Sequence, residues 1–171
     1  RRQRQMCIRD RLKDIPAVMD IYNDAILHTT ATFDTEIKDY EDRLAWFQAH
    51  TGQYVIFVYE EAGTVAGYAS LSRYRERKAF DPAVEISIYI HAGYRGRGIG
   101  RSLMEKTLQY AKECPQIGTV VSLITSENEV SIRLHERFGF SYCGQIRQAG
   151  VKFGRKLGLN AYQIIYDREI E

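Results

Sequence analysis

The segment Tyr94-Arg-Gly-Arg-Gly-Ile-Gly-Arg101 follows a strand-like run and precedes a long amphipathic stretch. Glycines allow a tight turn and bring several backbone N–H groups close to one anion. The N-terminus of the helix expected after the segment favours a phosphate, and Arg95, Arg97 and Arg101 add positive charge. The sequence therefore predicts a loop that binds a pyrophosphate. A glycine-rich turn on its own is also compatible with an ordinary loop.

Two other nucleotide-binding loops do not fit this segment. A Walker loop ends in Gly-Lys-Ser/Thr, whereas this chain has Gly-Ile-Gly-Arg. A Rossmann fingerprint needs Gly-x-Gly-x-x-Gly in the first βαβ unit. Here Gly96, Gly98 and Gly100 recur at every second residue, and the loop comes late in the chain.

Alternation before the loop predicts a strand, and helical spacing after it predicts a helix. In Val84–Ile90 the polar residues Glu85, Ser87 and Tyr89 share one face, and three isoleucines share the other. Beyond the loop we expect a helix with Leu103, Met104, Leu108 and Ala111 on one side, a buried strand over Thr119–Ile124, and a short helix over Val130–Phe138.

The N-terminal half has the same mixed character. We expect a strand over Met6–Arg9, a helix capped by Asp14, a loop over His28–Ile37, a helix after Asp39, and a hairpin over residues 54–72. A last strand is expected over Leu159–Asp167. The pattern predicts one α+β domain over residues 6–171, with a mixed, mostly antiparallel central sheet flanked by helices. Residues 1–5 are expected to be a basic extension outside the fold.

Composition excludes several classes of function. The 171 residues suffice for one domain, and the net charge of +2 gives no reason to expect a nucleic-acid partner. The apolar runs are shorter than the about 20 residues needed to cross a membrane. Cys7, Cys114 and Cys143 are too widely spaced for a disulfide framework or a metal site, so we expect no metal, reduced thiols and a cytoplasmic location.

Two motifs resemble one known family. Arg95-Gly-Arg-Gly98-Ile-Gly100 matches the Arg/Gln-x-x-Gly-x-Gly/Ala loop with which GCN5-related N-acetyltransferases (GNAT) bind the pyrophosphate of coenzyme A. Asn128, before a helix that ends at Arg137-Phe-Gly-Phe140, is similar to the second coenzyme A motif of that family.

Other segments resemble the phosphinothricin and methionine sulfoximine acetyltransferases within this superfamily: Thr32–Glu36, Tyr74–Phe80, Val84–Tyr89 and Ala149–Gly154. The resemblance implies a GNAT-type domain whose central strands splay to hold acetyl-CoA, and a homodimer. It implies acetyl transfer to the α-amine of a small amino-acid-like molecule such as methionine sulfoximine, phosphinothricin or methionine sulfone, by direct attack with general-base assistance. The cofactor-binding residues expected are Ile88, Tyr89, Ile90, Arg95, Gly96, Arg97, Gly98, Ile99, Gly100, Arg101 and Asn128.

The chemistry requires a group that accepts a proton from the amine, because an alkylammonium with a pKa near 10 is protonated at neutral pH. Glu85 is the candidate base, on its position and on the resemblance; the alternative is a structural ion pair with an arginine. His135 stands where relatives place a donor to the leaving thiolate, and it is equally compatible with a structural role. The substrate-binding residues expected are Phe33, Arg75, Glu76, Arg77, Phe80, Ile86 and Ser87, with Arg75 and Arg77 as partners of a carboxylate.

Departures from the family pattern leave alternatives open. Relatives often show Gly-x-Trp-x-Asp near the C-terminus, where this chain has Lys156 and Gly158 in place of the tryptophan and aspartate. The acceptor could therefore be another small amine or a protein N-terminus. A coenzyme A-binding regulatory domain without catalysis is the third reading, against which the retained Glu85 argues.

Overall fold

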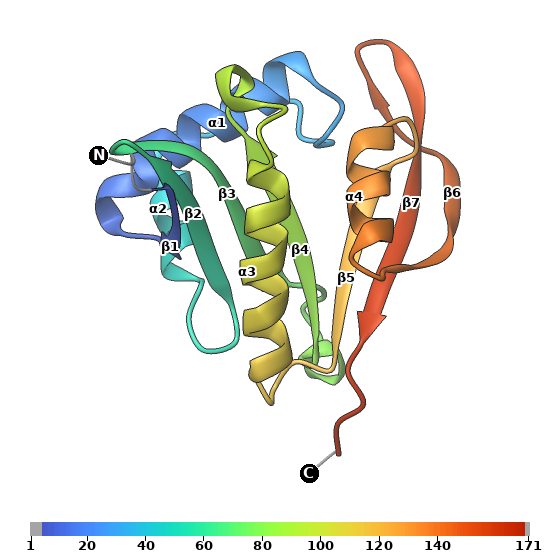
Figure 1. Cartoon of the computed structure of the whole chain (residues 1–171). Helices are drawn as coiled ribbons and strands as arrows, with labels where there is room; N and C mark the ends of the chain where they lie inside the picture. The colour runs from blue at the N-terminus through green and yellow to red at the C-terminus, as the bar shows by residue number, and fades with distance from the viewer. Residues whose placement is uncertain (1–4, 170–171) are drawn as a thin grey trace.

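A seven-stranded sheet in the order β1-β2-β3-β4-β5-β7-β6 forms the centre of the computed structural model, which describes residues 5–169 (Figure 1). Neighbouring strands are antiparallel except β4 and β5, which are parallel. This confirms the predicted α+β fold. The strands are β1 (Gln5–Arg9), β2 (Val55–Glu61), β3 (Thr64–Arg73), β4 (Ala83–Ile90), β5 (Thr119–Thr125), β6 (Ser141–Lys152) and β7 (Arg155–Ile165).

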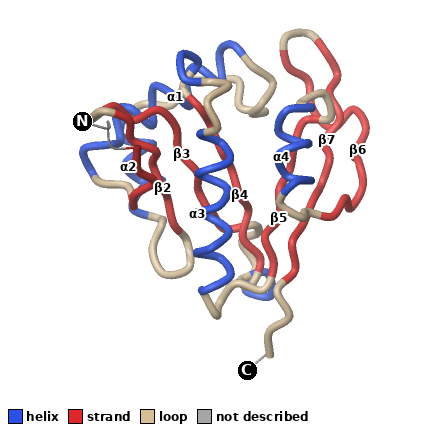
Figure 2. The backbone as a smooth tube through the Cα atoms, viewed as in Figure 1, coloured by secondary structure: helices blue, strands red, loops and turns tan. Residues whose placement is uncertain are grey.

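Within residues 5–169, four α-helices cover the two faces of the sheet (Figures 1 and 2). α1 (Ile15–His28) and α2 (Tyr40–Gln48) pack on one face, whose core includes Ile26 and Tyr68. α3 (Ile99–Glu113) and α4 (Glu129–Arg137) lie on the other face, whose core includes Leu103 and Met104. In the part of the chain that the structure describes, none of the helices combines the length and apolarity needed to cross a membrane.

The two helix starts expected at aspartates differ in how they are capped. Asp39 accepts a hydrogen bond from the backbone N–H of Asp42 at 2.8 Å, as an N-cap should. Asp14 precedes α1 but makes no cap hydrogen bond; instead its carboxylate accepts from the backbone and the guanidinium of Arg11. Of the expected N-terminal extension, Gln5 belongs to β1, and residues 1–4 lie outside the described residues.

β4 is the strand on which the sheet opens. It pairs with β3 from Val84 to Ile90, whereas its pairing with β5 covers Ala83, Val84 and Glu85. Beyond Glu85, β4 and β5 diverge, as Figure 1 shows. The predicted splay is thus present, and it begins at the residue expected to be the base.

The C-terminal hairpin of β6 and β7 is longer than the sequence indicated. The last strand was expected over Leu159–Asp167, but β7 begins at Arg155; of β6, only Ala149–Gly154 was indicated, by its resemblance to a closing hairpin. β6 is an edge strand, largely exposed, and its register with β7 shifts at two places. The shifts interrupt the two-residue alternation by which a strand is normally recognised.

Candidate active site

The predicted pyrophosphate loop has the backbone geometry of an anion site. Gly96 and Gly98 have φ angles of +77° and +78°, a left-handed conformation that glycine adopts without strain. Gly98 is the N-cap of α3, and its carbonyl accepts from the N–H of Ser102 at 3.2 Å. The first N–H groups of a helix lack intrahelical acceptors, so those at the start of α3 are free to donate to an anion.

The three arginines of this loop are exposed, and the ion pairs of two of them are long. Arg97 Nη1 lies 3.7 Å from Glu61 Oε2, and Arg101 Nε lies 3.6 Å from Glu105 Oε1. Exposed ion pairs of this kind contribute little stability, about 0–1 kcal/mol. The arginine side chains can therefore reorient toward a phosphate at small cost.

A cavity of about 550 Å³ lies on the face of the sheet that carries α1 and α2. Its floor is formed by three cross-strand pairs of β3 and β4: Tyr68 with Tyr89, Ser70 with Ser87, and Ser72 with Glu85. Its other lining residues are Tyr22, Arg43, Trp46, Ala49, His50, Tyr54, Arg73 and Glu76. The predicted common face of Glu85, Ser87 and Tyr89 is confirmed, and this face borders the cavity.

Glu85 has the properties of a proton acceptor. Burial raises the pKa of its carboxyl group, and the positive charge of Arg75 opposes that rise. Desolvation disfavours the charged form of a carboxylate, which makes it a stronger base than an exposed one. The arrangement supplies a base inside a cavity, at the point where β4 leaves β5.

The structure brings together some of the residues expected to bind a substrate. Ser87 and Glu76 line the cavity with Glu85, and Arg75 is close enough to influence the pKa of Glu85. The cavity lining, among the described residues, does not include the side chains of Phe33, Arg77 or Phe80. Phe80 is 40% exposed and packs edge-on against Tyr74, and Arg77 is exposed at the start of the η2 turn (Lys78–Phe80).

Ile86 was expected to contact the substrate, and here the structure differs. Its side chain is 3% exposed and belongs to the core under α3, on the face opposite Glu85. Successive side chains of a strand point to opposite faces, so the neighbour of Glu85 cannot share its cavity. We therefore leave Ile86 out of the acceptor site.

His135 has a structural environment. It is buried, its Nδ1 lies 2.7 Å from the carbonyl oxygen of Ser131, and its Nε2 lies 2.8 Å from Ser122 Oγ. Because a carbonyl can only accept, Nδ1 carries the proton and Nε2 accepts from the serine hydroxyl. Burial lowers the pKa of the imidazole. Both nitrogens of the neutral ring are satisfied, so the geometry does not support the expected role as a proton donor.

The remaining cofactor residues lie around the opening of the sheet. Ile88 and Ile90 pack against the α3-side core, which leaves their backbone as the part that could face a ligand. Tyr89 points the other way, where burial raises the pKa of its hydroxyl to about 12. The side chain of Asn128 caps α4 by accepting from the N–H of Ser131 at 3.2 Å.

Three residues of α2 and its C-terminal end were not predicted for the site: Arg43, Trp46 and His50. His50 Nδ1 lies 2.5 Å from the carbonyl oxygen of Trp46 and donates to it, so Nε2 accepts from Ser72 Oγ at 2.8 Å. Burial lowers the pKa of His50. Nothing in the sequence of α2 pointed to these residues, because their proximity to β4 arises from tertiary packing.

The hairpin of β6 and β7 contacts the segment between α1 and α2 across the opening. Lys152 is buried and donates from Nζ to the carbonyl oxygen of Thr32 at 2.8 Å. Glu127 accepts from Arg155 and from the Thr30 hydroxyl, and these hydrogen bonds, that from Arg155 above all, lower the pKa of Glu127 to about 2. These contacts tie the two halves of the sheet together beyond the point where β4 and β5 separate.

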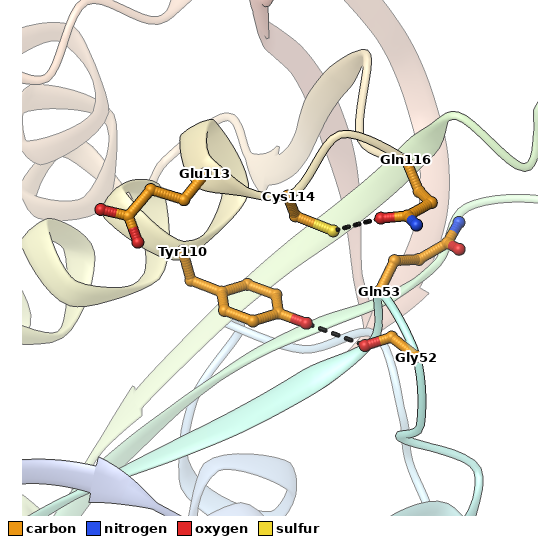
Figure 3. Close-up of a pocket in the computed structure, with 6 residues that line it drawn as sticks. All are labelled: Gly52, Gln53, Tyr110, Glu113, Cys114 and Gln116. Atoms are coloured by element: carbon orange, nitrogen blue, oxygen red, sulfur yellow. Dashed lines mark hydrogen bonds between the residues drawn. The ribbon is translucent and has the colours of Figure 1, made fainter. Parts of the chain in front are cut away.

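A second hollow, of about 470 Å³, lies at the C-terminal end of α3 (Figure 3). Tyr110 Oη donates to the carbonyl oxygen of Gly52 at 2.8 Å, and Cys114 Sγ lies 3.1 Å from Gln116 Oε1. It is at the opposite end of the helix from the glycine loop and holds no group with a role in the chemistry considered above. We therefore assign the site to the cavity beside Glu85.

Comparison with known proteins agrees with the splayed sheet and glycine loop. Residues 16–140 match the acetyltransferase (GNAT) family. The chain is 38% identical over 162 residues to the L-amino acid N-acyltransferase MnaT of Escherichia coli K12, covering 94% of each chain. It is 41% identical over 155 residues to the L-methionine sulfoximine/L-methionine sulfone acetyltransferase of Salmonella typhimurium LT2, covering 90% of each.

A solved structure, yncA of Salmonella typhimurium with its cofactor acetyl-CoA, superimposes with a TM-score of 0.92 at 38% identity, covering 98% of this chain and 96% of that one. The chain belongs to the acetyltransferase (GNAT) family. The resemblance stated from the sequence is thereby confirmed.

Proposed function

We propose that the protein is an N-acetyltransferase that moves the acetyl group of acetyl-CoA to the α-amine of a small amino-acid-like acceptor. One observation carries the proposal: Glu85, with its pKa raised by burial, faces a cavity at the residue where β4 parts from β5. The names of the two relatives, an L-amino acid N-acyltransferase and an L-methionine sulfoximine/L-methionine sulfone acetyltransferase, support this acceptor class.

The chain offers suitable residues for acetyl-CoA. The left-handed glycines Gly96 and Gly98 and the free N–H groups at the start of α3 would hold the pyrophosphate, with Arg95, Arg97 and Arg101 around it. The backbone of Ile88–Ile90, on the side that β5 has left, would hold the pantetheine arm. When bound, acetyl-CoA supplies an acetyl group activated as a thioester.

Glu85 and its neighbours would prepare the amine. The ionised carboxylate of Glu85 attracts the acceptor's ammonium group and then accepts one of its protons, which leaves a neutral, nucleophilic nitrogen. Ser87 and Glu76 would orient the acceptor from the same cavity. The burial of Glu85 lowers the local dielectric constant, which strengthens these polar interactions.

The size of the cavity favours a small acceptor. A volume of about 550 Å³ lies within the range of small-molecule sites, about 300–1,000 Å³. A protein N-terminus would need an open groove along which a peptide could lie. We further propose that the enzyme acts in the cytoplasm, as a homodimer.

The test is a spectrophotometric assay of thiol release with acetyl-CoA and a panel of amino acids, including methionine sulfone, methionine sulfoximine and phosphinothricin. We expect turnover with at least one of them and a loss of about 10²–10⁴-fold in kcat for Glu85→Gln at neutral pH. The loss should shrink at high pH, where the amine deprotonates unaided.

Glu113→Gln, in the second hollow, is the matched control and should behave as wild type. An unchanged rate and pH profile for Glu85→Gln would remove Glu85 from the mechanism. Absence of thiol release with every amine, together with acetyl-CoA binding, would support the non-catalytic alternative.

A further inference from the structure

The cavity beside Glu85 contains a buried arginine. Arg43 lies in α2 and is 8% exposed, yet it lines the cavity. Its guanidinium carbon lies 4.9 Å from the ring centroid of Tyr22 and 4.8 Å from that of Trp46. Contact with two aromatic rings restricts the planar guanidinium to one orientation, so it is organised before any ligand arrives.

The hydrogen bonds of Arg43 leave part of the guanidinium available. Nε and Nη2 both donate to Asp42 Oδ1, at 3.0 and 2.8 Å. A guanidinium has five N–H donors, and among the described residues Nη1 has no protein acceptor. Nη1 is also not among the buried atoms that lack a partner, so it is not sealed away from solvent. Nη1 is thus a solvent-accessible donor on a side chain that lines the cavity.

The guanidinium of Arg43 is paired with the carboxylate of its neighbour Asp42, at 2.8 Å, and its charge also acts on the groups that line the cavity. Burial raises the pKa values of Tyr68 and Tyr89, and the positive charge of Arg43 opposes that rise; burial lowers the pKa of His50, and the charge of Arg43 adds to that fall. The arginine whose charge acts on Glu85 is a different one, Arg75. Arg43, through the Nη1 donors that Asp42 does not occupy, and Glu85 both line one cavity, which suits a molecule that carries both an ammonium and an anionic group.

We propose that Arg43 binds the carboxylate of the acceptor while Glu85 receives its amine. This inference rests on the proposed function and makes it more specific: the acceptor is an amino acid with a free carboxylate. The sequence suggested Arg75 and Arg77 for this role, but both side chains are exposed and neither lines the cavity. A buried guanidinium held against aromatic rings binds a carboxylate more strongly than an exposed arginine does.

The experiment compares methionine sulfone with its primary amide, which keeps the amine and the side chain but lacks the carboxylate. We expect Arg43→Met to lower kcat/KM for the acid about tenfold to a hundredfold, the loss typical of hydrogen bonds to a charged group. The value for the amide should change less than threefold. Arg43→Lys, which keeps the charge but loses the fork of donors, should give an intermediate loss for the acid. Arg133→Met on the exposed face of α4 is the matched control and should leave both substrates unaffected.

The ratio of acid to amide separates recognition from folding. If Arg43 only packs between Tyr22 and Trp46, its replacement will lower activity on both substrates equally, and the inference fails while the proposed function stands. If Arg75→Met rather than Arg43→Met removes the preference for the acid, the carboxylate is bound at the loop and the inference is wrong. A wild-type enzyme that acetylates neither compound nor any other amine would overturn the proposed function, and this inference with it.

Discussion

Gly150, in the hairpin of β6 and β7, tests how closely this hairpin packs against Phe33. A Cβ atom added at this position would lie 2.4 Å from Phe33 Cδ1 and 2.5 Å from Phe33 Cε1, whereas ordinary contacts are 3.4–4 Å. Gly150→Ala must therefore push the Phe33 ring, or the hairpin, by about 1 Å. Overpacking of this kind costs about 1–3 kcal/mol. For a chain of this length that predicts a fall in Tm of about 2–12 °C.

The assay is thermal unfolding followed by circular dichroism, with Gly118→Ala as the matched control. A Cβ at Gly118 would lie 3.5 Å from Pro82 Cβ, an ordinary contact, so this substitution should be neutral or slightly stabilising. In a Phe33→Ala background the cost of Gly150→Ala should largely disappear, because the clashing ring is gone. Equal Tm values for Gly150→Ala and Gly118→Ala, or a cost that persists without Phe33, would refute the reasoning.

Three further predictions follow from other parts of the chain. Gly98→Val should raise the KM for acetyl-CoA at least about tenfold. Gly52→Val, which places the same left-handed strain in a distant turn, should lower Tm without changing that KM. Equal KM values for the two variants would mean that the glycine loop does not bind the pyrophosphate. Leu103→Ala should lower the free energy of unfolding by about 2–5 kcal/mol in urea titrations, since Leu103 is fully buried under the sheet, and a change below about 1 kcal/mol would contradict that placement. Burial lowers the folded-state pKa values of His50 and His135, so the stability that their neutral rings contribute is complete above pH 6.5 and is lost as the pH falls toward the folded-state pKa values. His135→Gln should therefore show a shallower loss of stability between pH 7 and 5 than wild type. An equal slope would argue against the buried neutral ring.

Local patterns predicted the half of the site that lies on one strand and the loop after it. Glu85, Ser87 and Tyr89 share a face because side chains alternate along any strand, and that rule needs no knowledge of the neighbours. Gly96 and Gly98 sit where the backbone is left-handed, a conformation whose residue preference is intrinsic. Such features are encoded within a few residues, and the structure confirms them.

The rest of the site depends on packing between distant segments. Arg43 stands in a helix with the sequence Tyr-Glu-Asp-Arg-Leu-Ala-Trp-Phe-Gln, where an arginine is typical of a solvent-exposed face. Its burial follows from the rings of Tyr22 and Trp46, which lie on two different helices. For His135 the sequence left a donor role and a structural role open, and the contact of its second nitrogen with Ser122, from another element, favours the structural one. No spacing rule within the sequence reports such partners.

The opening of the sheet has a mechanical consequence for the site. Parallel pairing of β4 with β5 ends at Glu85, so beyond that residue the separation of the strands is set by contacts above and below the sheet. On the α3 side, Gly100 lies so near Leu134 of α4 that an added Cβ would be 3.5 Å from the Leu134 Cδ2 atom. On the other side, Lys152 and Gly150 hold the segment that carries Thr32 and Phe33. We therefore expect a change at the hairpin to alter the width of the opening, and the shift imposed by Gly150→Ala should appear in the KM values of both substrates as well as in Tm.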